Sequence, residues 1–249
     1  MLSSVRDQLL QSIGPNDVLL DVGGWADPFE RADWVVDLMP YESRGLYVRK
    51  GWVEPRGLPE RFSEATWIQR DLCDRTPFPF GDRQIDFAIC SQTLEDLRDP
   101  VWVCSELQRV AKAGYIEVPS RLEEQSWGVN GPFVGWSHHR WLVDIDEARI
   151  EFVHKLHSIH SRPDQCFPST FYEQLTVEER VQSLWWTGEL VARERIFLEE
   201  EESDRYLSDF VSTVLAARGW TADADYARRG PGWERLTRRL ASGLTKSRT

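Results

Sequence analysis

The chain has 249 residues, with 41 acidic side chains against 30 lysines and arginines, so its formal net charge is −11. Hydrophobic residues make up 41% of the sequence and charged residues 29%, a balance typical of a folded globular protein rather than a disordered one. The acidic balance argues against a nucleic-acid partner, because phosphate contacts require a basic surface. A membrane partner is not expected either, because no apolar run approaches the roughly 20 residues that a spanning helix needs.

The first residues, MLSSVRDQLLQSIG, lack the basic and then apolar pattern of a secretory signal, so a cytoplasmic location is expected. Four cysteines are spread along the chain without a CxxC pair, and in a cytoplasmic protein we expect them to be reduced thiols. The length suits one domain, or a domain with an appendage.

Taken in chain order, the predicted elements of the first half alternate between helices and short apolar strands. Apolar residues at helical spacing predict a helix over 4–13, and Pro100 opens a second helix that runs to Val110, with Gly114 as its cap. Five buried strands are predicted, at 18–22, 34–38, 66–70, 84–90 and 115–118. Short apolar strands joined by long connections indicate a parallel sheet with crossovers, so the predicted fold class is α/β.

After Pro119 the pattern changes. A loop rich in glycine and tryptophan covers 120–143, and two more strands are predicted at 149–160 and 189–198. A helix is predicted at 206–218, and the chain ends in a basic tail, 226–249.

Acidic residues and glycines stand where three of the predicted strands end. Asp21 closes the first strand just before Gly23 and Gly24, Asp37 ends the second strand, and Asp71 follows the third. Ligands of open parallel sheets bind at the carboxyl ends of the strands. Acidic groups there suit a ligand with several hydroxyls and amines, such as a nucleoside with a cationic group, and not a polyphosphate.

These residues and two longer blocks resemble class I S-adenosylmethionine-dependent methyltransferases, in particular their methyltransferase type 11-like branch. The blocks are PFPFGDRQIDFAICSQTLEDLRDP (77–100) and ELQRVAKAG (106–114). The resemblance implies a Rossmann-like, doubly wound sheet of seven mostly parallel strands, with 149–160 and 189–198 as its antiparallel C-terminal edge. It also implies a methyltransferase-like domain over 1–225, with a cofactor half at about 15–120 and an acceptor and lid half at about 120–225.

The resemblance assigns the methionine and ribose ends of S-adenosylmethionine to four residues. Asp21 would organise the first turn and face the methionine part, while Gly23 and Gly24 would let the backbone approach the cofactor. Asp37 would accept hydrogen bonds from the two ribose hydroxyls, which suits a carboxylate.

The adenine end and the methyl donor are assigned to four others. Asp71 would accept a bond from the adenine amino group, and Leu72 would donate its backbone N–H to the ring. Ser91 and Gln92 would lie under the methyl donor.

The glycine turn departs from the family pattern. The second and third glycines of the family are Trp25 and Asp27 in this chain, and Pro28 interrupts the short connection to the next strand. The usual full helix between the first two strands is therefore expected to be reduced to a turn.

Histidines give the most specific signals of the second half. His138 and His139 lie in the loop after the fifth strand, and one of them is predicted to accept the proton of an oxygen nucleophile; the alternative is that both are structural. His154, His157 and His160 recur every third residue, but in a strand His157 would face away from the other two, so no metal site is predicted.

The predicted function is methyl transfer from S-adenosylmethionine to a small molecule, to a hydroxyl of a sugar or a natural product. The tryptophan-rich loop 127–141 would serve as a lid over this acceptor. One alternative is a methyltransferase-like fold that binds without catalysis or acts as a scaffold, as Trp25 and Asp27 suggest. Another is a Rossmann oxidoreductase, which the missing GxGxxG motif disfavours. The oligomeric state is left open.

Overall fold

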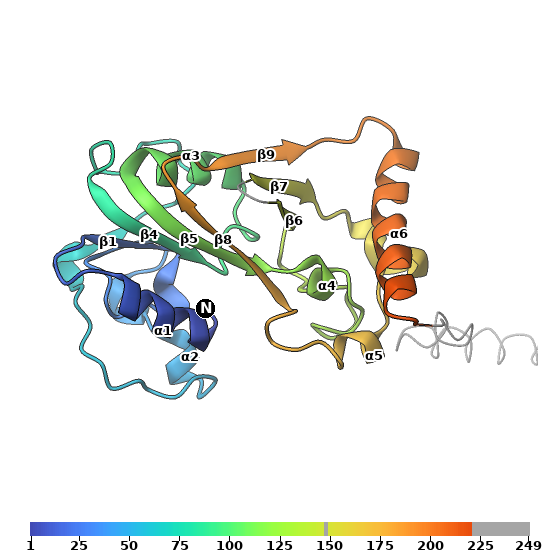
Figure 1. Cartoon of the computed structure of the whole chain (residues 1–249), viewed down its shortest axis with the longest axis horizontal. Helices are drawn as coiled ribbons and strands as arrows, with labels where there is room; N and C mark the ends of the chain where they lie inside the picture. The colour runs from blue at the N-terminus through green and yellow to red at the C-terminus, as the bar shows by residue number, and fades with distance from the viewer. Residues whose placement is uncertain (147–148, 221–249) are drawn as a thin grey trace, which may run out of the picture. The chain divides into compact units, whose positions relative to one another are not determined.

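The computed structural model describes residues 1–146 and 149–220, and the chain divides into two compact units (Figure 1). Unit 1 comprises 1–119, 140–153 and 181–195. Unit 2 comprises 120–139, 154–180 and the described part of the chain from 196 onward. The predicted basic tail, 226–249, lies outside the described residues.

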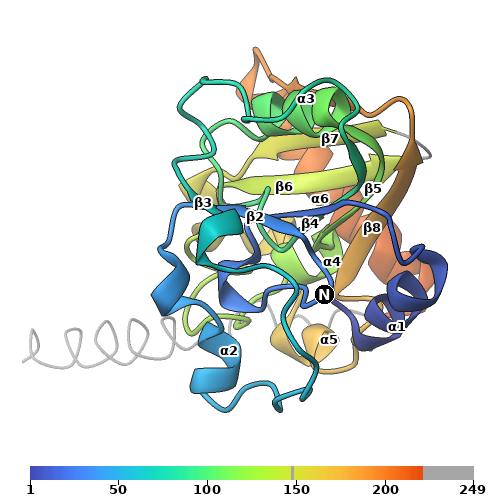
Figure 2. The same cartoon turned by 90° about the vertical axis from the view of Figure 1, so that its left-hand side faces the viewer.

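Unit 1 is built on a mostly parallel sheet, to which six strands of the described chain contribute. They are β1 (Leu19–Val22), β2 (Trp34–Asp37), β3 (Trp67–Gln69), β4 (Ile85–Ser91), β5 (Ala111–Pro119) and β8 (Val181–Thr187). Their order is β3-β2-β1-β4-β5-β8, and only β8 runs antiparallel to its neighbour (Figure 2). The chain moves outward from β1 to β3 and then returns to β4, so the switch point lies between β1 and β4. The predicted Rossmann-like α/β fold with an antiparallel edge is confirmed, with six strands in place of seven.

Successive residues of each strand pack into different hydrophobic cores on the two faces of this sheet, because strand side chains alternate between faces. On one face the strands pack against helix α1 (Ser3–Ser12), through Leu9, Leu19, Val35, Ile89 and Tyr115. On the other face they pack against α3 (Pro100–Val110), through Leu20, Val36, Ala88, Ile116, Val103 and Leu107. Figure 1 shows α3 and α1 on opposite sides of the sheet, the doubly wound arrangement that was predicted.

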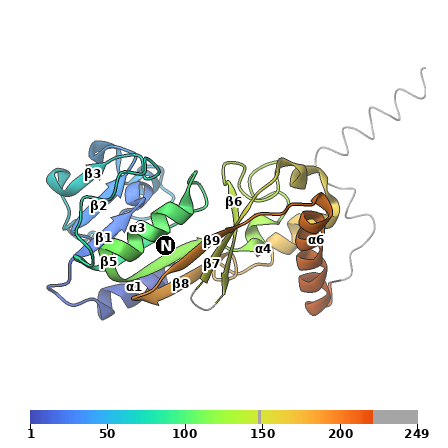
Figure 3. The ribbon, with the colours of Figure 1, turned by 90° about the horizontal axis from the view of Figure 1, so that it is seen from above.

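The antiparallel edge is formed by a segment that the sequence analysis did not assign. The strands predicted at 149–160 and 189–198 do not join the main sheet. As β7 (Arg149–His154) and β9 (Val191–Arg195) they pair in parallel, in a three-stranded sheet with β6 (Trp141–Asp146) (Figure 3). The edge strand is β8, whose register on β5 places Trp186 opposite Gly114.

Gly114 was predicted to cap the preceding helix, but it lies inside β5. A Cβ at Gly114 would lie 2.5 Å from the carbonyl oxygen of Ala88 and 2.7 Å from the Trp186 ring. The indole of β8 therefore occupies the space that a side chain at 114 would need.

The connection between β1 and β2 contains one 3-10 turn, Gly24–Ala26, in place of a helix. The predicted reduction to a turn is confirmed. The longer connection to β3 contains α2 (Leu46–Arg49) and two further 3-10 turns, at Tyr41–Ser43 and Glu64–Thr66.

Unit 2 is formed mainly by helical segments. They are α4 (Arg121–Glu124), α5 (Ser169–Tyr172), α6 (Glu200–Ala217) and the 3-10 turns His157–Ser161 and Pro163–Gln165. Phe167, Phe171 and Leu175 form its core with Val211 of α6. Over residues 1–146 and 149–220, none of the helices combines the length and the apolar character needed to cross a membrane.

Candidate functional site

The carboxyl ends of β1 and β2 bring together the four residues assigned to the methionine and ribose ends of the cofactor. Val22 of β1 lies beside Val36 of β2, and the N–H of Gly23 donates to the carbonyl oxygen of Val36 at 2.9 Å. The glycine turn therefore begins directly beside Asp37.

Asp21 is buried under this turn, with 3% of its surface exposed. Its Oδ2 accepts the N–H of Phe29 at 2.8 Å, and a Cβ at Gly24 would lie 2.2 Å from the same oxygen. Burial raises the pKa of Asp21 to about 7, although the Phe29 N–H and the charge of Arg6 act in the opposite direction. Asp21 thus holds the turn to the start of the following loop, and its contact with a methionine group stays a prediction.

Gly23 adopts φ = 79°, in the left-handed region that favours glycine. A Cβ at this position would lie 2.2 Å from Oγ1 of Thr93, in the loop after β4. The turn after β1 and the loop after β4 therefore approach each other across the switch point.

Asp37 is almost fully buried at the end of β2. Its Oδ1 accepts the N–H of Met39 at 2.8 Å, and its Oδ2 accepts the N–H of Trp25 at 3.0 Å. Burial raises the pKa of Asp37 against the effect of these bonds. The backbone N–H of Leu38 acts in the same direction as these bonds. Because a carboxylate offers about four lone-pair directions, Asp37 keeps acceptor capacity beside its backbone bonds.

Trp25 and Asp27, which stand where the resembling family has glycines, connect the turn to neighbouring segments. The indole Nε1 of Trp25 donates to the carbonyl oxygen of Ser43 at 2.7 Å. Asp27 accepts two bonds from Arg56, at 2.6 and 3.0 Å, and pairs with Arg6 of α1 at 3.2 Å. In this chain Trp25 and Asp27 thus hold the long β2–β3 connection and α1 against the glycine turn.

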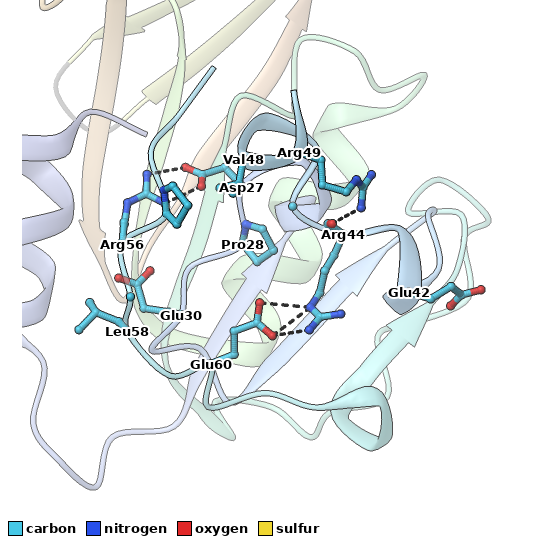
Figure 4. A pocket seen from close by; sticks show the side chains of 13 residues that line it. Asp27, Pro28, Glu30, Glu42, Arg44, Val48, Arg49, Arg56, Leu58 and Glu60 are labelled. Carbon is cyan, nitrogen blue, oxygen red and sulfur yellow. Dashed lines mark hydrogen bonds and ion pairs between the residues drawn. The ribbon is translucent and has the colours of Figure 1, made fainter. Parts of the chain in front are cut away.

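Asp27 also lines a cavity of about 410 Å³ between the turn and the β2–β3 connection (Figure 4). This volume is in the range of small-ligand sites. Two guanidinium groups on its wall are paired with carboxylates, Arg56 with Asp27 and Arg44 with Glu60. The charges of the wall are therefore largely satisfied within the protein.

The adenine-side residues lie in the turn after β3. Asp71 accepts the N–H of Cys73 on Oδ1 at 2.9 Å, and its Oδ2 pairs with Arg98. The Asp71 side chain is 45% exposed, whereas the Leu72 side chain is buried in the core that contains α3. Arg98 therefore competes for the carboxylate oxygen that the adenine amino group would use.

Ser91 and Gln92 both direct their side chains at Glu117 of β5. Oγ of Ser91 lies 3.0 Å and Nε2 of Gln92 lies 3.3 Å from Oε1 of Glu117, and the Tyr115 hydroxyl lies 2.8 Å from Oε2. Glu117 is 1% exposed. Burial alone would raise the pKa of Glu117, but the N-terminal amino group and these donors hold it below its usual value.

In unit 2 the structure distinguishes the two candidate catalytic histidines. His139 is buried, and its Nδ1 lies 2.8 Å from Oε1 of Glu124. Oε2 of the same carboxylate lies 2.7 Å from Nζ of Lys155. His138 is exposed, and its ring is edge-on to that of His139 with 4.5 Å between centroids.

The other three histidines do not form the single strand that was expected. His154 ends β7, whereas His157 and His160 lie in a 3-10 turn. Nδ1 of His160 accepts the N–H of Val134 at 3.1 Å. The prediction that these histidines bind no metal stays a prediction.

Sequence reasoning missed four residues that shape these sites: Arg6, Arg56, Glu124 and Lys155. Arg6 and Arg56 lie 21 and 29 residues from Asp27, and Glu124 and Lys155 are 31 residues apart. A local pattern cannot link residues at such separations. The rarity of lysine, with only four in the chain, was the one available signal for Lys155.

Comparison with known proteins gives weak similarities of structure. A methyltransferase from Mesorhizobium loti, described as S-adenosylmethionine-dependent, is 15% identical over 61% of this chain and 62% of its own, with a TM-score of 0.35. One from Aquifex aeolicus is 19% identical over 46% of this chain and 64% of its own, with a TM-score of 0.32. The cyclase SpnF is 18% identical over 47% of this chain and 45% of its own, with a TM-score of 0.35.

This chain thus covers less than two thirds of each of these structures. No family model matches the sequence, and no curated protein is significantly similar to it. At this level of similarity, the fold assignment stands on the strand order observed in the chain itself.

Proposed function

We propose that this chain is a class I methyltransferase that uses S-adenosylmethionine to methylate a hydroxyl of a small molecule, such as a sugar or a natural product. The observation that carries the proposal is the position of Asp37. It is a buried carboxylate at the end of β2, beside a glycine turn and next to the switch point, with acceptor capacity left beside its backbone bonds. The methyltransferase-like blocks at 77–100 and 106–114 give independent support.

The residues at this edge of the sheet fit the cofactor. Asp37 would hold the ribose, and Asp71 with the backbone of Leu72 would hold the adenine. A Cβ at Gly23 would overlap Thr93 and a Cβ at Gly24 would overlap Asp21, so contacts within the protein require both glycines. When bound, the cofactor supplies a methyl group on a positively charged sulfur.

The contribution of the protein to transfer would be positioning and proton removal. Holding the acceptor oxygen in line and at contact distance accounts for most of the rate enhancement in such a displacement. The hydroxyl must also lose its proton, for which a histidine of the 127–141 loop is the proposed base. Trp141 belongs to the core of unit 1, so Trp127 and Trp136 are the tryptophans of this loop that would contact the acceptor.

A specific observation favours a second candidate, a methyltransferase-like protein that does not catalyse. Arg98 already pairs with Asp71, the carboxylate assigned to the adenine amino group. If this contact excludes the cofactor, the fold would serve only as a binding or scaffold protein.

The test is binding of S-adenosylhomocysteine, measured by thermal shift and by titration calorimetry. A ligand at 100 times its dissociation constant should add about 2.7 kcal/mol to the free energy of unfolding. A variant of the adenine side, Asp71→Asn, should bind more weakly than the wild type. Asp74→Ala is its matched control, because Asp74 lies in the same turn as Asp71 and pairs with Arg70. Absence of any shift at millimolar ligand, with the wild type folded, would favour the scaffold.

A further inference from the structure

The cavity beside the glycine turn lies entirely within unit 1. Its volume of about 410 Å³ falls within the roughly 300–1,000 Å³ of small-ligand sites. Its wall comes from the shortened β1–β2 connection, at 27–30, and from the long β2–β3 connection, within 42–60. Of the described residues assigned to the cofactor, none lines it. The chemistry of this wall decides which kind of small molecule the cavity fits.

Two arginines of the wall are held in fixed planes by carboxylates of the same wall. Arg56 donates from both terminal nitrogens to Asp27, at 2.6 and 3.0 Å. Arg44 donates from Nε and Nη2 to Oε2 of Glu60, at 2.9 and 2.6 Å. Its Cζ also lies 3.8 Å from the centre of the Tyr41 ring. Side chains fixed in this way lose little conformational freedom when a ligand binds to them.

Glu30 brings an unfilled hydrogen-bond acceptor to this wall. It is 8% exposed, and its Oε2 pairs with Arg6 of α1. Over the described residues, its Oε1 is buried and has no hydrogen-bond partner. Leaving such an oxygen without a donor is costly. A ligand group that donates to Glu30 would remove this cost, whereas a carboxylate or a phosphate would be repelled by it.

The charges around the cavity cancel, which favours a neutral ligand. Four carboxylates and three guanidinium groups line it, and Arg6, which pairs with Glu30, supplies the fourth positive charge. Burial opposes ionisation of Asp27, but the bond from Arg56 and the charge of Arg6 hold its pKa below the usual value. Taking a charged ligand out of water is costly without an opposite charge to pair with it. The wall offers no excess of either sign.

Hydroxyl groups fit both the donors and the acceptors of this wall, because a hydroxyl donates its hydrogen and accepts through its lone pairs. A guanidinium carries five N–H groups, and Arg56 directs two of them to Asp27, so donors remain. Neighbouring hydroxyls of a sugar ring can therefore accept from a guanidinium and donate to a carboxylate such as Glu30.

The wall also has an apolar part that suits the C–H faces of a sugar ring. It consists of Pro28, Val48, Pro55 and Leu58. In the view of Figure 4, Pro28 lies between the two arginine–carboxylate pairs. A ring that packs against Pro28 would thus have polar groups around it on which its hydroxyls can bond.

We propose that this cavity binds a neutral sugar, with hydroxyls bonded to Arg44, Arg56 and Glu30. The inference goes beyond the proposed function and does not depend on it, because such binding requires neither the cofactor nor methyl transfer. The ligand is held by hydrogen bonds and apolar contacts alone.

The first test uses the methyl α-glycosides of glucose, galactose and mannose, which are uncharged and differ only in the orientation of single hydroxyls. At least one should bind in titration calorimetry and shift the backbone amide NMR signals of Gly45 and Gly57, which line the cavity. The amide of Gly131, in unit 2, should not shift. Absence of binding by all three at high millimolar concentration, or tighter binding of sulfate than of any glycoside, would overturn the proposal.

The second test changes the wall. Arg44→Lys keeps the positive charge but loses the planar fork that pairs with Glu60, so glycoside affinity should fall about tenfold or more. Val48→Phe should abolish binding, because it fills the cavity without removing a polar group. Arg61→Gln is the matched control, since Arg61 follows Glu60 but pairs with Asp33, outside the wall. Wild-type affinity in folded Arg44→Lys and Val48→Phe, or an equal loss in Arg61→Gln, would overturn the proposal.

S-adenosylhomocysteine distinguishes this site from the predicted cofactor site. The affinity for the glycoside should be the same with and without it. Displacement of the glycoside by S-adenosylhomocysteine would make the cavity part of the cofactor site and would overturn the proposal. Glycoside binding by a wild type that does not bind S-adenosylhomocysteine would support the sugar site and contradict the proposed function instead.

Discussion

The backbone N–H of Trp25 donates to Oδ2 of Asp37 at 3.0 Å, which joins the turn after β1 to the end of β2. Trp25 stands where the resembling family has a glycine, and Asp37 is the carboxylate predicted to bind the ribose. The bond uses only the backbone of residue 25, and the tryptophan side chain packs against the core that contains Leu9 and bonds to Ser43. The unusual residue therefore does not by itself remove the acceptor capacity of Asp37.

Asp37→Ala should weaken binding of S-adenosylhomocysteine by about 1.5 to 3 kcal/mol, because charge-assisted bonds to two hydroxyls would be lost. It should also lower the free energy of unfolding by about 1 to 3 kcal/mol, because the N–H groups of Trp25 and Met39 lose their acceptor. Calorimetry and urea unfolding measure the two effects separately. Unchanged affinity in a folded variant would remove Asp37 from the site.

Asp71→Asn should reduce the affinity for S-adenosylhomocysteine and leave the melting temperature of the free protein almost unchanged. The pair of Asp71 with Arg98 is exposed, and such pairs contribute only about 0 to 1 kcal/mol. Arg98→Gln should raise the affinity, because it removes the competitor for the same oxygen. A loss of stability in Asp71→Asn with intact binding would make Asp71 a turn residue only.

Asp21 should make the free energy of unfolding depend on pH. Its pKa is raised to about 7 by burial, so between about pH 4 and pH 7 the folded state holds a proton that the unfolded state has released. The stability that this proton provides is fully present below the unfolded pKa. The free energy of unfolding then falls by about 1.4 kcal/mol per pH unit as pH rises through that window. Asp21→Asn should abolish this slope, so the variant should gain stability over the wild type between pH 4 and pH 7. Parallel pH profiles of the two proteins in urea unfolding would contradict the burial effect.

Gly114→Ala should destabilise the protein by about 1 to 3 kcal/mol or more, because the new methyl would overlap the carbonyl of Ala88 and the Trp186 ring. Gly45→Ala is a useful comparison, since φ at Gly45 is 70° but no atom lies within 4 Å of a Cβ there. It should cost only the conformational strain, about 1 kcal/mol. Equal melting temperatures for the two variants would argue against the register of β8 on β5.

Local features of the sequence were enough to predict much of unit 1. The runs around Leu20, Val36 and Ile89 are apolar because both faces of a parallel strand are covered, and this makes such strands recognisable one at a time. The short spacing between Gly24 and Trp34 limited that connection to a turn, as observed. The carboxylates at the strand ends also followed from the sequence, since parallel strands place their ends on one edge.

Only the tertiary structure decided which strand completes the sheet and which groups surround the histidines. The segments at 149–160 and 189–198 and strand β8 all have plausible strand patterns, and the choice depended on the fit of Trp186 over Gly114. In the same way, His138 and His139 are equivalent neighbours in the sequence. The contacts of Glu124 with His139 and with Lys155 join residues up to 31 positions apart, and such pairings are set by packing and burial, which a linear pattern does not contain.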